Sequence, residues 1–246
     1  TTGDITSAAV TSITGTAAEV QAALDNAQLV SLGDMDATIS DAGAVAATVL
    51  TDLAAATTGD ITSAAVTSIT GTAAEVRAAL ENGQLISLDA VDATIDISVA
   101  AAADLIAIDN NTLGQVDATA VTEITGSAAN ILTVINSVGI TTSLTYDATV
   151  DDGEISVANA NLIDADTTGV ITATISDDLI ATLRGLTGTG NAYTIVTSDT
   201  AAAASDLLAI DGLTTVTVDA TKVRSVTGTM AELEALRDAI LDGTID

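Results

Sequence analysis

A stretch of eight residues contains four carboxylates: Asp147, Asp151, Asp152 and Glu154, with Gly153 between the last two. Calcium takes about six to eight oxygen ligands, several of them charged, so this spacing suits a calcium site. The order of the acids differs from the DxDxDG order of an EF-hand loop. The alternative interpretation is a solvated turn whose acids cap the next helix. Calcium is the only cofactor that the sequence predicts.

A second set of aspartates recurs in the tripeptide Asp-Ala-Thr, beside strand-like sequence. Its members are Asp36, Asp92, Asp117, Asp147 and Asp219. In strands stacked about 4.8 Å apart, like charges repel unless they are offset, hydrogen-bonded or bridged by cations. We interpret them as aspartates that accept hydrogen bonds from turn N–H groups, with a ladder of metal ions as the alternative.

The residue types argue against an enzyme. The chain contains no histidine and no cysteine, which excludes Ser/His/Asp and Cys/His catalysis and zinc sites built on these ligands. Adjacent carboxylates such as Asp151 and Asp152 could transfer protons, but with 34 acidic residues in the chain such pairs arise by chance. The glycines of residues 185–190 lack the Lys-Ser/Thr of a phosphate-binding loop and are read as a turn.

Charge limits the partners. Thirty-four acidic residues against five basic ones give a net charge of −29, which repels nucleic acids and anionic lipid surfaces. No apolar run reaches the ~20 residues needed to cross a bilayer. Tyr146 and Tyr193 are the only aromatic residues, so alanine, valine, isoleucine and leucine must form the core. Such small side chains suit thin layers packed closely together.

The main signal is a duplication. Residues 1–32 match residues 57–88 at 28 of 32 positions, and the block TTGDITSAAVTSITGTAAEV is identical in both copies. Strand-like phrases with β-branched residues in alternation, such as Val66–Thr70 and Val170–Ser176, recur every 22 to 30 residues. Alanine-rich segments of helical periodicity lie between them. A fixed spacing of this kind indicates a repeat architecture.

Capping sequences mark where the helices begin. Thr16 with Glu19, Thr72 with Glu75, and Thr229 with Glu232 fit the capping box, and Ser127 with Asn130 is a weaker relative. In the last helix Met230, Leu233, Leu236 and Ile240 fall on one apolar face.

These elements predict an α/β fold: a repeat solenoid with a wall of parallel strands and short alanine-rich helices, in about nine turns of 22–30 residues. Phrases such as DITSAAVTSITG are long enough to hold two short strands around a bend. A three-sided β-solenoid with one helix per coil is therefore a variant of the same prediction.

We expect one array over residues 1–246. It comprises near-identical repeats at 1–56 and 57–112 and divergent repeats at 113–246, with two domains meeting near residue 140 as the alternative. Solenoids usually end in polar caps, and neither end of this sequence has one. We therefore expect each end to be covered by further chain or by the next copy in a filament.

The phrases ITGTAAEV, DATISD, TTGVITATISD and SDTAAAASDLLAIDGL resemble repeats of very large bacterial surface proteins, notably repetitive cyanobacterial cell-surface and motility-associated proteins. The resemblance covers nearly the whole chain and implies an extracellular location at the bacterial cell surface and an adhesive or structural role. Such proteins often bind calcium through GGxGxDxUx nonapeptides, which this sequence lacks.

The sequence thus predicts an extracellular structural repeat protein that associates with itself end to end, as a filament subunit or a segment of a giant adhesin or surface layer. A module that binds surface glycans or another ligand through its sheet face is the alternative. Sugar sites usually expose aromatic rings, and only Tyr146 and Tyr193 are available. A carboxylate-based polysaccharide lyase or hydrolase is a third, more remote hypothesis.

Overall fold

The structure is a computed structural model that describes residues 5–6, 10–30 and 32–246. Part of the first copy of the duplicated block, including residues 1–4 and 7–9, lies outside the described residues. Contacts group the chain into two compact units. Unit 1 comprises residues 1–121 and 137–142, and unit 2 comprises residues 122–136 and 143–246. We describe each unit by itself.

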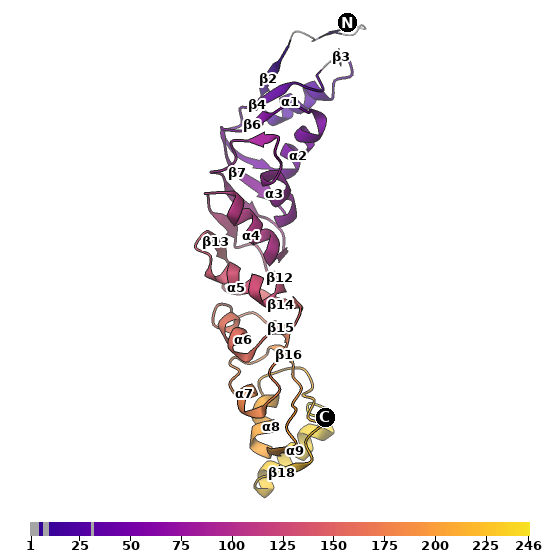
Figure 1. The fold of residues 1–246 in the computed structure, drawn as a ribbon, viewed down its shortest axis with the longest axis vertical. Helices are drawn as coiled ribbons and strands as arrows, with labels where there is room; N and C mark the ends of the chain where they lie inside the picture. The colour runs from indigo at the N-terminus through magenta and orange to yellow at the C-terminus, as the bar shows by residue number, and fades with distance from the viewer. Residues whose placement is uncertain (1–4, 7–9, 31) are drawn as a thin grey trace. The chain divides into compact units, whose positions relative to one another are not determined.

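Unit 1 alternates short strands with short helices (Figure 1). Its strands are β1 (Ile5–Thr6), β2 (Ser12–Gly15), β3 (Leu29–Val30), β4 (Asp36–Ile39), β5 (Gly43–Ala46), β6 (Ile61–Thr62), β7 (Val66–Gly71), β8 (Leu85–Ile86), β9 (Asp92–Ile95), β10 (Val99–Ala101), β11 (Val116–Ala118) and β13 (Ile140–Thr142). Its helices are α1 (Ala17–Leu24), α2 (Ala47–Ala56), α3 (Ala73–Leu80) and α4 (Ala102–Asn111). We call one helix together with the strands that directly precede it a rung, so that β6, β7 and α3 form one rung.

The strands of unit 1 pair in parallel. One sheet has the order β2-β4-β6-β8, a second has the order β5-β7-β9-β11-β13, and β1 pairs with β3. Paired residues lie about one rung apart in the sequence, as Ser12 pairs with Asp36 and Ile61 pairs with Leu85. Parallel strands need a crossover connection, and the helices provide it. The predicted parallel sheets and short helices are confirmed.

The duplication and the strand pairing have different periods. The pair Ser12–Asp36 recurs 56 residues later as Ser68–Asp92, but the first lies in the β2-β4-β6-β8 sheet and the second lies in the other sheet. The partners within each pair are 24 residues apart, and 56 is not a multiple of 24. The first ladder therefore continues into the second copy through β6 and β8, and the other ladder begins with β5, which lies within the first copy.

The core of unit 1 lies between the helices and the sheets. Helix α1 contacts α2, α2 contacts α3, and α3 contacts α4, and Figure 1 shows this succession of helices. Ala47, Leu50 and Leu53 of α2 are fully buried, as is Ile69 of β7. Small residues at the start of the helices allow the next rung to come close, because the position of a Cβ on Gly71 lies 3.5 Å from the Ala47 Cβ.

Unit 2 follows the same scheme with less regular spacing. Its strands are β12 (Glu123–Ser127), β14 (Asp147–Asp152), β15 (Ile171–Thr174), β16 (Ala192–Thr194), β17 (Ala201–Ala203) and β18 (Ser225–Thr227). Its helices are α5 (Ala128–Asn136), α6 (Val157–Asp164), α7 (Ile180–Leu183), α8 (Ala204–Asp211) and α9 (Met230–Asp242). Strands β12, β14, β15 and β16 are parallel neighbours in one sheet, and β17 pairs in parallel with β18.

Two of the predicted elements form, but one of them is less buried than the sequence predicts. The phrase DITSAAVTSITG holds two strands, β6 and β7, as the two-strand interpretation requires. The last helix forms as predicted, but its apolar face is only partly buried: Leu236 is buried, whereas Met230 and Ile240 are exposed. Periodicity predicts which residues share a face, but burial also requires an element that covers this face.

Candidate functional site

A recurring arrangement of hydrogen bonds joins successive rungs, and we call it the inter-rung clamp. In its first instance the hydroxyl of the buried Thr57 donates to the Met35 carbonyl of the preceding rung at 2.7 Å. The same hydroxyl accepts from the N–H of Gly59 at 3.1 Å. The equivalent groups are Thr112 with Val91 and Gly114, Thr167 with Tyr146 and Gly169, and Thr214 with Tyr193 and Val216.

The glycine of the clamp is required by a close approach of two backbones. A Cβ on Gly59 would lie 2.3 Å from the Met35 carbonyl oxygen. The corresponding distances are 2.2 Å from Gly114 to the Val91 oxygen and 2.1 Å from Gly169 to the Tyr146 oxygen. No side chain fits at such distances. In the fourth clamp Val216 stands at this position.

The aspartates of the Asp-Ala-Thr tripeptides accept hydrogen bonds from backbone N–H groups, as predicted. The Asp36 carboxylate accepts from the Asp60 N–H of the next rung at 2.9 Å. Asp92 accepts from the N–H of Gln115 at 2.8 Å, and Asp147 accepts from the N–H of Val170 at 2.7 Å. Asp117 and Asp219 instead accept from the hydroxyl and N–H of Thr119 and Thr221 in their own turns.

The hydrogen bonds in these turns affect the acidity of the two aspartates. The Thr119 hydroxyl, followed by the Thr119 N–H, lowers the pKa of Asp117, and the same groups of Thr221 lower the pKa of Asp219. Hydrogen bonds to a carboxylate favour its charged form. The hydrogen bonds confirm the interpretation as acceptors from turn N–H groups for Asp117 and Asp219.

The helix N-termini are capped from within the rung and from the next rung. The three predicted capping boxes form, at Thr16 with Glu19, at Thr72 with Glu75 and at Thr229 with Glu232. The N–H of each threonine is the largest cause of a lowered pKa of its glutamate. The weaker relative also forms, since the Asn130 N–H donates to the Ser127 hydroxyl at 3.2 Å.

A further cap comes from an aspartate of the following rung, which the sequence analysis missed. The Ala17 N–H at the start of α1 donates to the Asp41 carboxylate at 2.6 Å. Likewise the Val157 N–H of α6 donates to Asp177 and the Ile180 N–H of α7 donates to Asp199. The sequence does contain a signal for this cap, an aspartate about 20 residues after the start of the helix. This signal identifies the cap only when the number of residues between paired strands is known.

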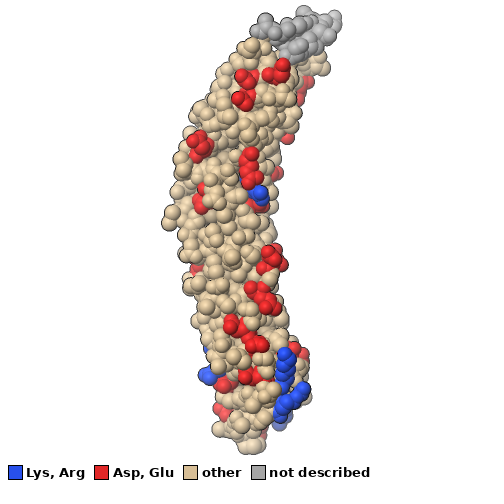
Figure 2. Space-filling model, viewed as in Figure 1, with Lys and Arg blue, Asp and Glu red and all other residues tan. Residues whose placement is uncertain are grey.

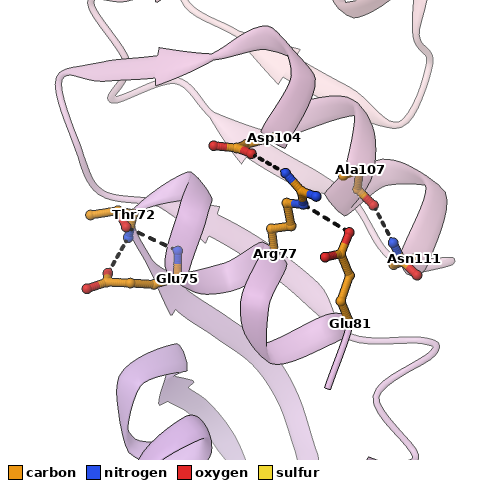
Figure 3. A network of polar contacts seen from close by, with 7 residues as sticks. All are labelled: Thr72, Glu75, Arg77, Glu81, Asp104, Ala107 and Asn111. Carbon is orange, nitrogen blue, oxygen red and sulfur yellow. Dashed lines mark hydrogen bonds and ion pairs between the residues drawn. The ribbon is translucent and has the colours of Figure 1, made fainter. Parts of the chain in front are cut away.

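Ion pairs connect neighbouring helices. Arg77 of α3 contacts Glu81 of the same helix and Asp104 of α4, each at 2.9 Å (Figure 3). In unit 2, Arg184 pairs with Asp206 of α8 at 3.0 Å. The hydrogen bond to Glu81, followed by the one to Asp104, raises the pKa of Arg77. The partners are partly exposed, so each pair contributes little to stability.

The four residues of the predicted calcium site are spread along β14: Asp147 is its first residue, Asp151 and Asp152 are its last two, and Glu154 follows the strand. Asp147 is exposed and already accepts from the Val170 N–H, and Asp151, Asp152 and Glu154 are exposed. Within residues 5–6, 10–30 and 32–246, no three acidic, histidine or cysteine side chains gather in a metal-binding group. Calcium at these four residues stays a prediction.

Unit 2 buries both tyrosines of the chain. The Tyr146 hydroxyl donates to Asp166 at 2.8 Å, whereas the Tyr193 hydroxyl is buried without a hydrogen-bond partner among the described residues. Burial is the largest cause of the raised pKa of both phenols. Asp164 accepts from Thr187 and from Asn191, both at 3.0 Å. These polar groups connect neighbouring rungs, and neither ring is at the surface.

A groove of unit 2 has a volume of about 460 Å³ and is lined by residues of α7 and α8. Residues 201–203, all alanine, line one side, and the Arg184–Asp206 pair lies in it. The two charges satisfy each other, so the groove offers a ligand no unpaired charge from this pair.

Comparison with known proteins gives no further indication of a role: no family model, no curated protein and no solved structure matches the chain. The features that the structure repeats are contacts between rungs, namely clamps, caps and ion pairs. Chemically, this arrangement fastens one rung to the next.

Proposed function

We propose that this chain is an extracellular structural repeat protein, a filament subunit or a segment of a giant surface adhesin or surface layer, that associates with itself end to end. The inter-rung clamp is the observation on which this proposal rests. Four clamps use the same hydroxyl-to-carbonyl bond. A device repeated in this way has a stacking role wherever it occurs, whereas a catalytic or binding site is normally built once.

The architecture we propose is a solenoid in which each rung covers the apolar face of its neighbour. A single rung has too few residues to form a core of its own. Its buried residues, such as Val76 of α3, belong to helices that contact the helices of the neighbouring rungs. Length can therefore grow by addition of rungs without a larger globular core, which suits a mechanical role.

The negative charge of the chain supports a location at the cell surface, in contact with water. Acidic side chains are spread over the visible face, and lysine and arginine are few (Figure 2). The net charge of −29 keeps a protein with 48% hydrophobic residues soluble. No helix within the described residues is long and apolar enough to cross a membrane. A bacterial cell-surface location is the setting we propose, in line with the phrases shared with bacterial surface repeats.

The burial of the aromatic residues bears on the glycan-binding alternative. Sugars commonly stack on exposed aromatic rings, and Tyr146 and Tyr193 are both fully buried. No other aromatic residue occurs in the chain. No observation therefore favours this alternative over a structural role.

Electron microscopy and X-ray scattering of the purified chain test the proposal. We expect thin rods whose length, but not width, increases with protein concentration, because addition occurs at the ends. Compact particles of constant radius at every concentration would contradict the proposal. A sample that hydrolyses or binds polysaccharide without forming rods would favour the other hypotheses.

A further inference from the structure

The turn after α3, in the second copy of the duplicated sequence, corresponds to the turn after α1 in the first copy. Asn82 and Gly83 lie in the turn between α3 and β8, and Asn26 and Ala27 lie in the turn between α1 and β3. Asn82-Gly83 is the only Asn-Gly dipeptide in the chain. The backbone nitrogen after an asparagine can attack the carbon of its side-chain amide, and glycine has no Cβ to hinder this attack.

The two turns make the same hydrogen bonds. The side-chain oxygen of Asn82 accepts from the Gln84 N–H at 3.0 Å, and that of Asn26 accepts from the Gln28 N–H at 3.0 Å. The N–H of each asparagine donates to the carbonyl three residues earlier, at 3.3 Å in both copies. The first copy is therefore a matched reference, in which the same turn contains alanine in place of glycine.

The side-chain hydrogen bond favours the attack in two ways. It closes a ring that contains both the Asn82 Cγ and the Gly83 nitrogen, so the amide stays beside the peptide bond that follows it. The Gln84 N–H also points at the oxygen on which negative charge develops when the nitrogen attacks Cγ. A donor placed at such an oxygen stabilises the tetrahedral intermediate.

The glycine of this turn is open to solvent. Gly83 is exposed, and a Cβ placed on it would have no neighbouring atom within 4 Å. Among the described residues its N–H donates to no backbone carbonyl. The nitrogen is therefore free to lose its proton and attack, and water can reach the product.

We propose that Asn82 is a site of spontaneous deamidation. The deprotonated Gly83 nitrogen forms a bond to the Asn82 Cγ, and the intermediate expels ammonia to leave a five-membered succinimide. Water then opens this ring. Cleavage of the new C–N bond gives aspartate at position 82, whereas cleavage of the original peptide C–N bond gives isoaspartate, through whose side-chain carbon the chain then continues. The reaction consumes one water, releases one ammonia, and is independent of the proposed end-to-end association.

The residues after Asn82 make contacts with the preceding rung. The Gln84 side-chain amide donates at 2.8 Å to the carbonyl of Thr57, whose hydroxyl makes the first inter-rung clamp. The Gln84 carbonyl accepts from the Ile61 N–H at 2.7 Å. Aspartate at position 82 keeps an oxygen for the Gln84 N–H, but isoaspartate adds a carbon atom to the backbone and displaces Gln84. Isoaspartate at this position therefore loosens the contact between the two rungs.

Mass spectrometry of the full chain, incubated folded at mildly alkaline pH and then digested with pepsin at low pH, tests the proposal. We expect Asn82 to deamidate roughly tenfold faster than Asn26, because only Asn82 precedes a residue without a Cβ. The variants Gly83→Ala and Ala27→Gly exchange the two turns, so the first should slow the reaction at Asn82 and the second should accelerate it at Asn26. Equal rates at the two asparagines of the wild type would overturn the proposal.

The same incubation in urea tests whether the fold leaves this site open. Because Gly83 is exposed in the folded chain, we expect Asn82 to react there at a rate comparable with that in the unfolded chain. An Asn82 that reacts in urea but stays intact in the folded chain would show that the fold protects it, which would also overturn the proposal.

Thermal unfolding followed by circular dichroism tests the effect on the rungs. The fraction of aged protein that contains isoaspartate should melt at a lower temperature than fresh protein. The variant Asn82→Asp is the control, since it adds the charge without the extra backbone atom, and it should melt close to wild type. If the isoaspartate form melts together with Asn82→Asp, the predicted loosening of the rung contact is wrong.

Discussion

Two clamps of unit 2 are built around a tyrosine, and they differ in their other parts. At Tyr146 the clamp combines the Thr167 hydroxyl with Gly169, which leaves no room for a Cβ. At Tyr193 the Thr214 hydroxyl makes the same bond at 2.7 Å, but Val216 stands in place of the glycine. The hydroxyl-to-carbonyl bond is thus common to both, and the glycine is needed only where the two backbones approach closely.

The tyrosine side chains differ as well. The Tyr146 hydroxyl donates to Asp166, and the Tyr193 hydroxyl has no partner within the described residues although it is buried. The residue after the tyrosine is Asp147 in the first clamp, where it accepts from the next rung, and Thr194 in the second. The first clamp is therefore the more completely satisfied of the two, which leads to four predictions.

The largest effect is expected for Gly169→Ala. The added Cβ would lie 2.1 Å from the Tyr146 carbonyl oxygen, so the rungs must separate, at a cost of about 2 to 3 kcal/mol in the free energy of unfolding. Val216→Ala in the other clamp should cost less than about 1 kcal/mol, because Val216 is exposed. Urea unfolding followed by tyrosine fluorescence measures both, since the two fluorophores are located at the two clamps. Equal losses would mean that the close approach is not specific to the first clamp.

The next largest loss in the free energy of unfolding is expected when the threonine hydroxyl common to both clamps is removed. Thr167→Val and Thr214→Val should each lose about 1 to 3 kcal/mol, because each leaves a tyrosine carbonyl without its donor. Serine at the same positions keeps the hydroxyl and serves as the control. If valine is tolerated at Thr214 but not at Thr167, the bond is not the common element that the comparison suggests.

Removal of the two phenol hydroxyls should have different effects on the free energy of unfolding. Tyr146→Phe removes the hydrogen bond to Asp166 and is expected to cost about 1 kcal/mol. Tyr193→Phe removes a buried hydroxyl that has no partner, so its free energy of unfolding should stay the same or increase. Thermal unfolding by circular dichroism measures both variants. A clear loss of stability in Tyr193→Phe would show that its hydroxyl has a partner.

Asp147→Asn should have the smallest effect, below about 1 kcal/mol, because the amide oxygen can still accept from the Val170 N–H. The same variant decides the calcium prediction. If calcium binds at Asp147, Asp151, Asp152 and Glu154, it should raise the melting temperature of the wild type and have less effect on Asp147→Asn. No change in the melting temperature of the wild type upon addition of calcium would reject the prediction.

Much of the local structure could be predicted because it depends on near neighbours in the sequence. The capping boxes join residues three apart, and all three form where Thr16, Thr72 and Thr229 indicate them. The aspartates of the Asp-Ala-Thr tripeptides were predicted as hydrogen-bond acceptors, which the structure confirms. The sequence did not indicate that Asp36 and Asp147 accept from the next rung, whereas Asp117 and Asp219 accept within their own turns.

The duplication gave the right class of fold but not its pairing. The sequence repeats after 56 residues, and the strands pair with a step of 24, as Ser12 pairs with Asp36. The clamp threonines were missed for the same reason. Thr57 and Met35 are 22 residues apart, and only the register of the sheets brings the hydroxyl to that carbonyl.

The sequence by itself determined the α/β alternation, the helix starts and a core built mainly from aliphatic side chains, because these follow from local propensity and composition; the burial of Tyr146 and Tyr193 in that core came from the structure alone. Only the tertiary structure decided which surfaces are covered. Val10 and Val66 lie in identical stretches of sequence, residues 1–20 and 57–76, yet Val10 is exposed and Val66 is buried. Burial of a strand or helix depends on the neighbour that packs against it, and the sequence of that element does not contain this information.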